Sequence, residues 1–269
     1  MSELIEAFIL GIVQGLTEFL PVSSSGHLEL MKYILNDDSL AQQSMMTTVF
    51  LHFATALSTV VVFRKDIIRL MTDILVSGRE GSTEARNFAF FIVISMVPAA
   101  VVGVFFDEIL ETLFHRKIIL VGALLLITGL LLLLSERIQV QKKALNMSRA
   151  FIIGLSQAFA ILPGLSRSGS TIATALLLGV DRTQAARFSF LMVIPLILGK
   201  MAKDLLSGDL MTNAPSSLYL LIGFISAFVT GILACTAMIN LVKASKLSWF
   251  AFYCFAVGLS VIAYKLVLG

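Results

Sequence analysis

The chain has 269 residues, of which 58% are hydrophobic and only 14% are charged, and its mean hydropathy is +0.95. A soluble globular protein does not bury so much apolar surface, so the composition excludes a soluble fold and indicates an integral membrane protein. The formal net charge of +3 is too small to indicate a nucleic-acid partner, and we expect none.

The first apolar segment, residues 4 to 34, is interrupted near its middle by Pro21 and by the run from Ser23 to Gly26. Proline and glycine stop a helix, and serine caps the next one. We therefore predict a re-entrant helix-loop-helix hairpin that enters the bilayer without crossing it. The segment has no basic N-terminal region and no small-x-small cleavage site, so we expect it to stay in the mature chain.

A second broken segment, residues 150 to 180, is interrupted by Pro163, Gly164 and the residues from Ser166 to Gly169. It predicts a second re-entrant hairpin. The other apolar runs predict six transmembrane helices, since most are long enough to cross about 30 Å of hydrocarbon. Three of them follow each hairpin, and they cover residues 45–63, 88–106, 118–134, 188–199, 218–242 and 249–268.

The two broken segments are related in sequence. A shift of 143 residues superimposes the first on the second without a gap and aligns identical residues, among them Gly11 with Gly154 and Gln14 with Gln157. The alternative is chance similarity between apolar stretches, which would not keep Gln, Ser and Gly in register. We therefore interpret the chain as a duplication.

Three spans after each hairpin are an odd number, so the second repeat enters the membrane from the opposite face. We expect an all-α polytopic membrane protein with one membrane domain, residues 1–269. It is an inverted-topology repeat, with repeat one at about 1–140 and repeat two at about 150–269. Loops at one predicted face hold most of the basic residues, including Arg64 and Arg137, so that face is cytoplasmic by the positive-inside rule. The hairpins then enter from opposite faces, and we expect their tips to meet inside the protein.

The hairpins differ in their polar residues at equivalent positions. Acid and base groups belong to the first hairpin and a fixed cation to the second, a division that suits a site assembled from both. The differing pairs are Glu18 and Ile161, Ser24 and Arg167, and His27 and Ser170.

Glu18 is a candidate for the centre of this site, because a carboxylate inside a membrane is costly and is usually functional. Gln14 lies four residues earlier on the same helical face, and an interhelical hydrogen bond is its alternative role. Arg167 presents a planar fork of donors that suits phosphate oxygens, and its alternative role is to neutralise Glu18.

His27 is one of three histidines in the chain. It follows Ser24 by three residues, so it is a candidate general acid or base toward a neighbouring hydroxyl or a leaving oxygen. His52 lies inside a predicted span and His115 in a loop, and we interpret both as structural or solvated.

The two polar motifs carry a resemblance to a known family. The stretch QGLTEFLPVSSSGH, residues 14–27, resembles the (E/Q)xxxE and PVSSSGH signatures of the undecaprenyl-pyrophosphate phosphatase family, bacterial membrane enzymes associated with bacitracin resistance. PGLSRSGST, residues 163–171, resembles the family's PGxSRSxxT signature. The similarity runs through the whole chain. It implies hydrolysis of undecaprenyl diphosphate to undecaprenyl phosphate and inorganic phosphate, which recycles the lipid carrier for peptidoglycan and cell-wall synthesis. It also implies the bacterial plasma (inner) membrane, with the active site open to the periplasmic or outer side.

The resemblance implies catalytic roles for Glu18, Ser24, His27 and Arg167. We expect an in-line displacement at the terminal phosphorus, in which Ser24 attacks or positions the attacking water, His27 handles the proton and Arg167 holds the phosphate. Spacing alone does not select among three adjacent serines, so the choice of Ser24 depends on the family. The expected substrate-binding residues are Gln14, Ser23, Ser25, Ser166, Ser168 and Thr171.

Glu18 either orients His27 or serves as a ligand of a divalent cation, Mg²⁺ or Ca²⁺, which both prefer carboxylate and phosphate oxygens. Gln14 stands where many relatives have Glu, so a two-carboxylate metal scheme lacks one ligand here.

A second hypothesis for the function is a transporter or flippase of a polyprenyl phosphate lipid, because inverted repeats with broken helices are typical of secondary transporters. The expected partners are a polyprenyl diphosphate lipid and membrane lipids, and the sequence leaves a homodimer open.

Overall fold

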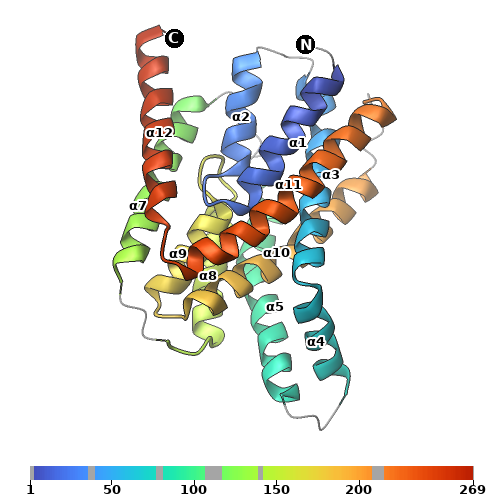
Figure 1. Cartoon of the computed structure of the whole chain (residues 1–269), viewed down its shortest axis with the longest axis vertical. Helices are drawn as coiled ribbons and strands as arrows, with labels where there is room; N and C mark the ends of the chain where they lie inside the picture. The colour runs from blue at the N-terminus through green and yellow to red at the C-terminus, as the bar shows by residue number, and fades with distance from the viewer. Residues whose placement is uncertain are drawn as a thin grey trace.

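A computed structural model describes residues 3–35, 40–76, 81–106, 117–138, 142–207 and 215–268. Within these ranges the chain forms eleven α-helices and no β-strand, as the all-α prediction requires (Figure 1). In chain order they are α1 (Glu3–Phe19), α2 (Ser24–Leu35), α3 (Leu40–Val62), α4 (Arg64–Leu75), α5 (Ser82–Phe105), α7 (Ile118–Arg137), α8 (Met147–Phe159), α9 (Arg167–Leu177), α10 (Arg182–Ser207), α11 (Ser217–Lys243) and α12 (Ser248–Leu268).

Several of these helices are long and apolar enough to cross a membrane. Four meet that description on their own, namely α5, α7, α11 and α12. The pair Met46–Val62 and Arg64–Leu75 makes a fifth if it is counted as one span, although it bends by 72° where the polar first turn of α4 begins. The run predicted at 188–199 lies in α10, which is not among these helices in the described part of the chain. The protein is therefore a multi-pass membrane protein, with four or five such helices in the ranges that the structure describes.

Both predicted hairpins form as helix-loop-helix units. The first consists of α1 and α2 and the second of α8 and α9, so the helices break where the sequence predicts. Ser23 has a φ of 71° in the first loop, and Gly164 has a φ of 102° in the second. A Cβ on Gly164 would also lie 2.4 Å from the backbone oxygen of Val121, so both conformation and space require glycine there.

The first arms of the hairpins pack in equivalent ways on helices far away in sequence. Helix α1 lies along α11, and α8 lies along α5 (Figure 1). Gly11 permits the first contact, because a Cβ there would lie 2.4 Å from the backbone oxygen of Gly223. Gly154 permits the second, because its Cβ would lie 2.3 Å from the backbone oxygen of Ser95. The two glycines that align at the shift of 143 residues thus have matching packing roles.

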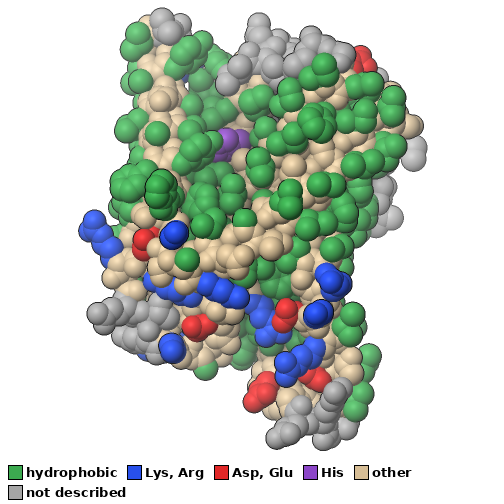
Figure 2. Space-filling model, in the orientation of Figure 1, with side chains coloured by type: hydrophobic (Ala, Val, Ile, Leu, Met, Phe, Trp, Pro, Cys, Tyr) green, Lys and Arg blue, Asp and Glu red, His purple; other side chains and the backbone are tan. Residues whose placement is uncertain are grey.

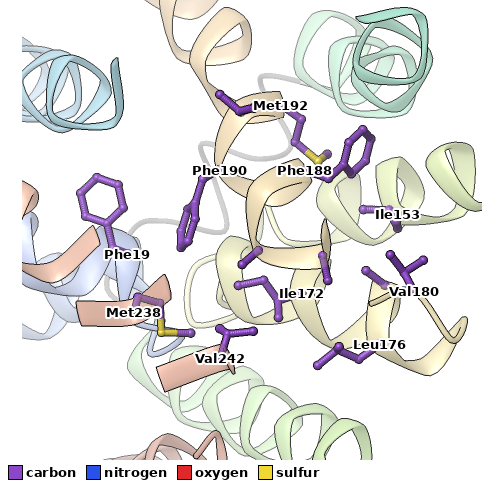
Figure 3. Close-up of a cluster of buried hydrophobic side chains, with 14 of the residues drawn as sticks. Phe19, Ile153, Ile172, Leu176, Val180, Phe188, Phe190, Met192, Met238 and Val242 are labelled. Atoms are coloured by element: carbon purple, nitrogen blue, oxygen red, sulfur yellow. The ribbon is translucent and has the colours of Figure 1, made fainter. Parts of the chain in front are cut away.

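A hydrophobic cluster lies beside the loops of the two hairpins (Figure 3). It joins Phe19 at the end of α1 to Phe190 of α10, whose ring centroids are 5.9 Å apart. Ile172 of α9 and Met238 of α11 are fully buried in the same cluster. Burial of these side chains fixes the ends of the hairpin helices, and so it fixes the polar residues next to them.

The surface divides into an apolar part and a band of charge. Figure 2 shows Lys and Arg side chains gathered across the lower half of the molecule, with hydrophobic side chains covering the upper half. Figure 1 shows both chain termini at the upper end, opposite the basic band. His115, which the sequence led us to interpret as structural or solvated, lies outside the described residues.

Candidate functional site

The tips of the two hairpins meet, as predicted. The backbone N–H of Gly164 in the second loop donates to Ser23 Oγ in the first loop at 3.1 Å. Ser168 Oγ donates to the carbonyl oxygen of Leu20 at 3.4 Å. Thr128 of α7 braces the second tip, because its hydroxyl donates to the carbonyl of Gly164 at 3.2 Å. The two hydrogen bonds between the loops join residues that are more than 140 positions apart in the chain.

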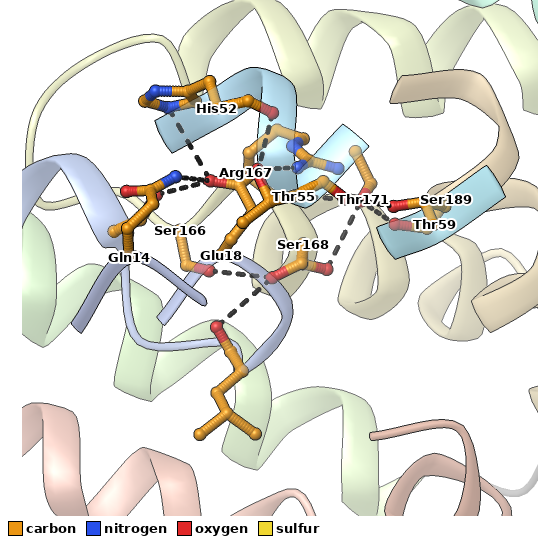
Figure 4. Close-up of polar contacts among 12 residues, drawn as sticks. Gln14, Glu18, His52, Thr55, Thr59, Ser166, Arg167, Ser168, Thr171 and Ser189 are labelled. Atoms are coloured by element: carbon orange, nitrogen blue, oxygen red, sulfur yellow. Dashed lines mark hydrogen bonds and ion pairs between the residues drawn. The ribbon is translucent and has the colours of Figure 1, made fainter. Parts of the chain in front are cut away.

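Glu18 lies at the centre of a polar cluster and is only 7% exposed (Figure 4). Its Oε1 pairs with Arg167 Nη2 from the other hairpin. Its Oε2 accepts hydrogen bonds from Gln14 Nε2 at 3.0 Å and from Ser24 Oγ at 2.8 Å. His52 Nε2 approaches the same oxygen at 3.7 Å. A buried carboxylate held by a cation and several donors is stable in this setting, because its charge is compensated.

The three adjacent serines of the first loop have different surroundings. Ser24 alone donates to the Glu18 carboxylate. Ser23 Oγ accepts from the backbone N–H groups of Gly26 and Gly164, so it holds the two loops together. Ser25 Oγ lies 3.4 Å from Ser23 Oγ. The structure thus distinguishes the serine next to a base from the serine that joins the loops, a distinction that spacing did not make.

Arg167 is the first residue of α9, and its guanidinium is only partly used by Glu18. Its Nη1 is buried and has no hydrogen-bond partner among the described residues. Ser166 caps the same helix by accepting from the backbone N–H of Gly169 at 3.1 Å, and Ser166 Oγ lies 3.3 Å from Ser168 Oγ. A free guanidinium N–H beside a serine-lined helix N-terminus forms a cradle for an anion.

Thr171 is positioned one helical turn further along α9. Its hydroxyl donates to the carbonyl of Arg167 at 2.8 Å and lies 2.6 Å from Ser189 Oγ of α10. Thr171 therefore contacts the backbone of Arg167 and the neighbouring helix α10. These two contacts hold α9 in position.

His27 is held by its own loop and by the last helix. Its Nδ1 is 2.8 Å from the carbonyl oxygen of Ser23, and its Nε2 is 2.8 Å from the hydroxyl of Tyr253 in α12. Both ring nitrogens have partners other than Glu18. The hypothesis that Glu18 orients His27 by direct contact is therefore wrong, because Gln14, Ser24 and Arg167 occupy the carboxylate.

His52 is the histidine that faces Glu18, a contact that the sequence analysis did not predict. Its Nδ1 lies 2.8 Å from the carbonyl oxygen of Thr48, which fixes the ring on α3. Sequence reasoning also missed Tyr253 and Ser189. For His52 the sequence did hold one signal, because an ionisable residue within an apolar span is usually functional.

The donor set next to Glu18 fits a divalent cation only in part. Gln14 Oε1 is buried and has no hydrogen-bond partner in the described structure. The Nε2 of the same side chain, and not Oε1, faces Glu18, so the amide would have to turn over before Oε1 faced the carboxylate. No group of three or more His, Cys, Asp or Glu residues suited to a metal occurs among the described residues. The protein thus offers two hard oxygen ligands, and phosphate oxygens would have to complete the coordination.

The chain is similar to a known protein family and to several named proteins. The model of the bacitracin resistance protein BacA family matches residues 7–260. A protein of Christiangramia forsetii named undecaprenyl-diphosphatase is 57% identical over 262 residues, which cover 97% of this chain and 98% of that protein. Proteins with the same name are 46% identical in Bacteroides fragilis, over 95% of this chain and 96% of the relative, and 45% identical in Bacteroides thetaiotaomicron, over 97% and 99%.

Proposed function

The chain belongs to the bacitracin resistance protein BacA family, and from this we infer that it is an undecaprenyl-diphosphate phosphatase. It hydrolyses undecaprenyl diphosphate to undecaprenyl phosphate and inorganic phosphate. The observation in the structure that best supports this activity is the contact of Ser24, Glu18 and Arg167, which joins a hydroxyl, a base and a phosphate-binding cation from two hairpins.

In the first step that we propose, Ser24 Oγ attacks the terminal phosphorus while Glu18 Oε2, 2.8 Å away, accepts the hydroxyl proton. The bond between that phosphorus and the bridging oxygen breaks, and undecaprenyl phosphate leaves with the bonding electrons. The terminal phosphoryl group remains on Ser24 as a phosphoserine. The geometry favours Ser24 over Ser23, whose hydroxyl joins the two loops.

In the second step, water attacks the phosphoserine, the Ser24 oxygen leaves, and inorganic phosphate is released. His27 accepts a proton from this water, because its Nδ1 faces a carbonyl and the lone pair of the neutral ring is therefore at Nε2. Glu18 returns to the Ser24 oxygen the proton it took in the first step. His27 gives its proton to the departing inorganic phosphate, so the free enzyme is restored.

Arg167 stabilises the charge that develops on the phosphoryl oxygens in both steps. Its buried Nη1 has no partner among the described residues, so it can donate to phosphate without first losing a bond. Ser166, Ser168 and the amide groups at the start of α9 surround the same position. Gln14, Ser25 and Thr171 support the cradle around them.

A divalent cation, Mg²⁺ or Ca²⁺, is proposed at Glu18 with Gln14 Oε1 as a second ligand. When bound, it would supply Lewis-acid polarisation of the phosphate oxygens. Every proton transfer described above uses the chain's own residues.

We also propose that six spans and two re-entrant hairpins form the inverted repeat, in the plasma membrane, with the site open to the outer side. The support is that α1 packs on α11 as α8 packs on α5, and that both termini lie opposite the basic band (Figures 1 and 2). Odd-numbered sets of spans after each hairpin would give this arrangement. A homodimer stays a prediction of the sequence alone.

Phosphate release from purified protein in detergent tests the proposed activity. Undecaprenyl diphosphate is the substrate, and the assay is run with and without a chelator. We expect inorganic phosphate to be released by the wild type and not by Arg167→Ala. Tight binding of the lipid without phosphate release would instead support the transporter hypothesis, which the names of the relatives do not favour.

A further inference from the structure

Tyr253 makes a contact with His27 that neither motif includes. The two rings are stacked, with an interplanar angle of 13° and centroids 5.6 Å apart, and Tyr253 Oη lies 2.8 Å from His27 Nε2. Tyr253 belongs to α12, 226 residues from His27. A residue from the last helix thus completes the surroundings of a motif residue near the start of the chain.

The direction of the hydrogen bond follows from the partner on the other ring nitrogen. The Ser23 carbonyl oxygen is only an acceptor, so His27 Nδ1 carries the hydrogen of the bond at 2.8 Å. In the neutral ring Nε2 then has a lone pair, and the Tyr253 hydroxyl donates to it. The Ser23 carbonyl thus selects the tautomer of His27 in which Nε2 is basic, and the Tyr253 hydroxyl occupies the lone pair of that nitrogen.

The pair also lies between the buried centre of the site and the surface. Glu18 is 7% exposed, whereas Tyr253 is 44% exposed. Figure 2 shows a hollow between the hydrophobic side chains of α12 and those of the neighbouring helices. Tyr253 is thus more accessible from outside than the carboxylate at the centre of the site.

We propose that Tyr253 carries the proton of the hydrolytic water to His27: the hydroxyl oxygen of Tyr253 accepts that proton while the hydroxyl hydrogen passes to His27 Nε2. The proposal rests on the proposed function, since it gives His27 a task in phosphoserine hydrolysis. It assigns to Tyr253 no contact with the reacting phosphorus.

Nitrogen NMR of the histidines tests the hydrogen bond without any need for activity. The protein is labelled with ¹⁵N-histidine, which gives only three side chains to assign because the chain has three histidines. Tyr253→Phe keeps the ring and removes the hydroxyl, so we expect the Nε2 resonance of His27 to shift. Tyr264→Phe is the matched control, since Tyr264 lies on the same helix and contacts Tyr33, with ring centroids 6.4 Å apart. The proposal is overturned if the His27 resonances are the same in both variants.

Steady-state phosphate release gives the second readout. We expect Tyr253→Phe to lower kcat about tenfold, the rate equivalent of one hydrogen bond, with KM changed less than about twofold. A rapid-quench measurement should show that phosphoserine hydrolysis, and not its formation, becomes slower. Equal kcat values for Tyr253→Phe and Tyr264→Phe would contradict the proposal. If the wild type releases no phosphate, the proposed function fails, whereas the NMR result still decides whether Tyr253 holds His27.

Discussion

The two hairpins have the same backbone plan and different chemistry. In the α1–α2 hairpin, Ser23 Oγ accepts from the backbone N–H of Gly26 at 3.2 Å. In the α8–α9 hairpin, Ser166 Oγ accepts from the backbone N–H of Gly169 at 3.1 Å. Each loop thus begins its second helix with the same serine cap, and these residues are the ones that align at the shift of 143 residues.

The functional side chains, by contrast, are not shared. Glu18 of the first hairpin corresponds to Ile161 of the second, and Ser24 corresponds to Arg167. Two carboxylates facing each other in a buried site would repel, whereas a carboxylate facing a guanidinium compensates its charge. The duplicated frame therefore supplies the geometry, and the divergence of a few residues supplies the hydroxyl, the carboxylate and the guanidinium that we propose as nucleophile, base and anion site.

Removal of the Arg167 guanidinium should have the largest effect. We expect Arg167→Ala to lower kcat/KM by about 10⁴-fold and Arg167→Lys to recover only part of it, because lysine lacks the planar fork. Phosphate release at saturating substrate measures kcat, and release at low substrate measures kcat/KM. Arg149→Ala is the control on the same hairpin, since that guanidinium binds the Ala144 carbonyl. Full activity of Arg167→Lys would show that a point charge suffices.

The second-largest effect should come from Ser24, and its neighbour Ser25 should matter less. We expect Ser24→Ala to lower kcat by about 10³-fold, because it removes the group that donates to Glu18. Ser25→Ala should cost less than about tenfold, since its hydroxyl contacts only Ser23. Mass spectrometry of acid-quenched enzyme should detect a phosphoserine at Ser24 in the wild type. A phosphoserine at Ser25 would reverse the assignment.

The matching glycines test whether the two halves pack alike. We expect Gly11→Ala and Gly154→Ala each to destabilise the protein by about 1–3 kcal/mol, because the added methyl meets backbone atoms. Thermal unfolding in detergent compares them with Gly103→Ala on α5, where a Cβ meets nothing within 4 Å. Loss of stability in only one of the two variants would contradict equivalent packing.

His52 should give the smallest of these effects. We expect His52→Leu to lower kcat about tenfold, since Glu18 loses a polar neighbour 3.7 Å from Oε2. His52→Gln keeps a donor at a similar place and should recover most of that loss. An unchanged rate in His52→Leu would mean that Gln14, Ser24 and Arg167 hold Glu18 without help.

The sequence by itself determined the features that local chemistry controls. Its composition required a membrane protein, and Pro21 and Pro163 with their neighbouring glycines and serines marked both hairpins. Each break depends on the φ limits of proline and on capping by serine, which act within a few residues. The motifs also identified Glu18 and Arg167, the two residues that meet at the centre of the site.

Only the tertiary structure decided which side chains face one another. It placed His52 beside Glu18 and His27 beside Tyr253, and of three adjacent serines it placed Ser24 against the Glu18 carboxylate. These contacts depend on the rotation and depth of α3 and α12 against the hairpins. Close packing across the whole chain sets this rotation and depth, so a local sequence pattern cannot predict them.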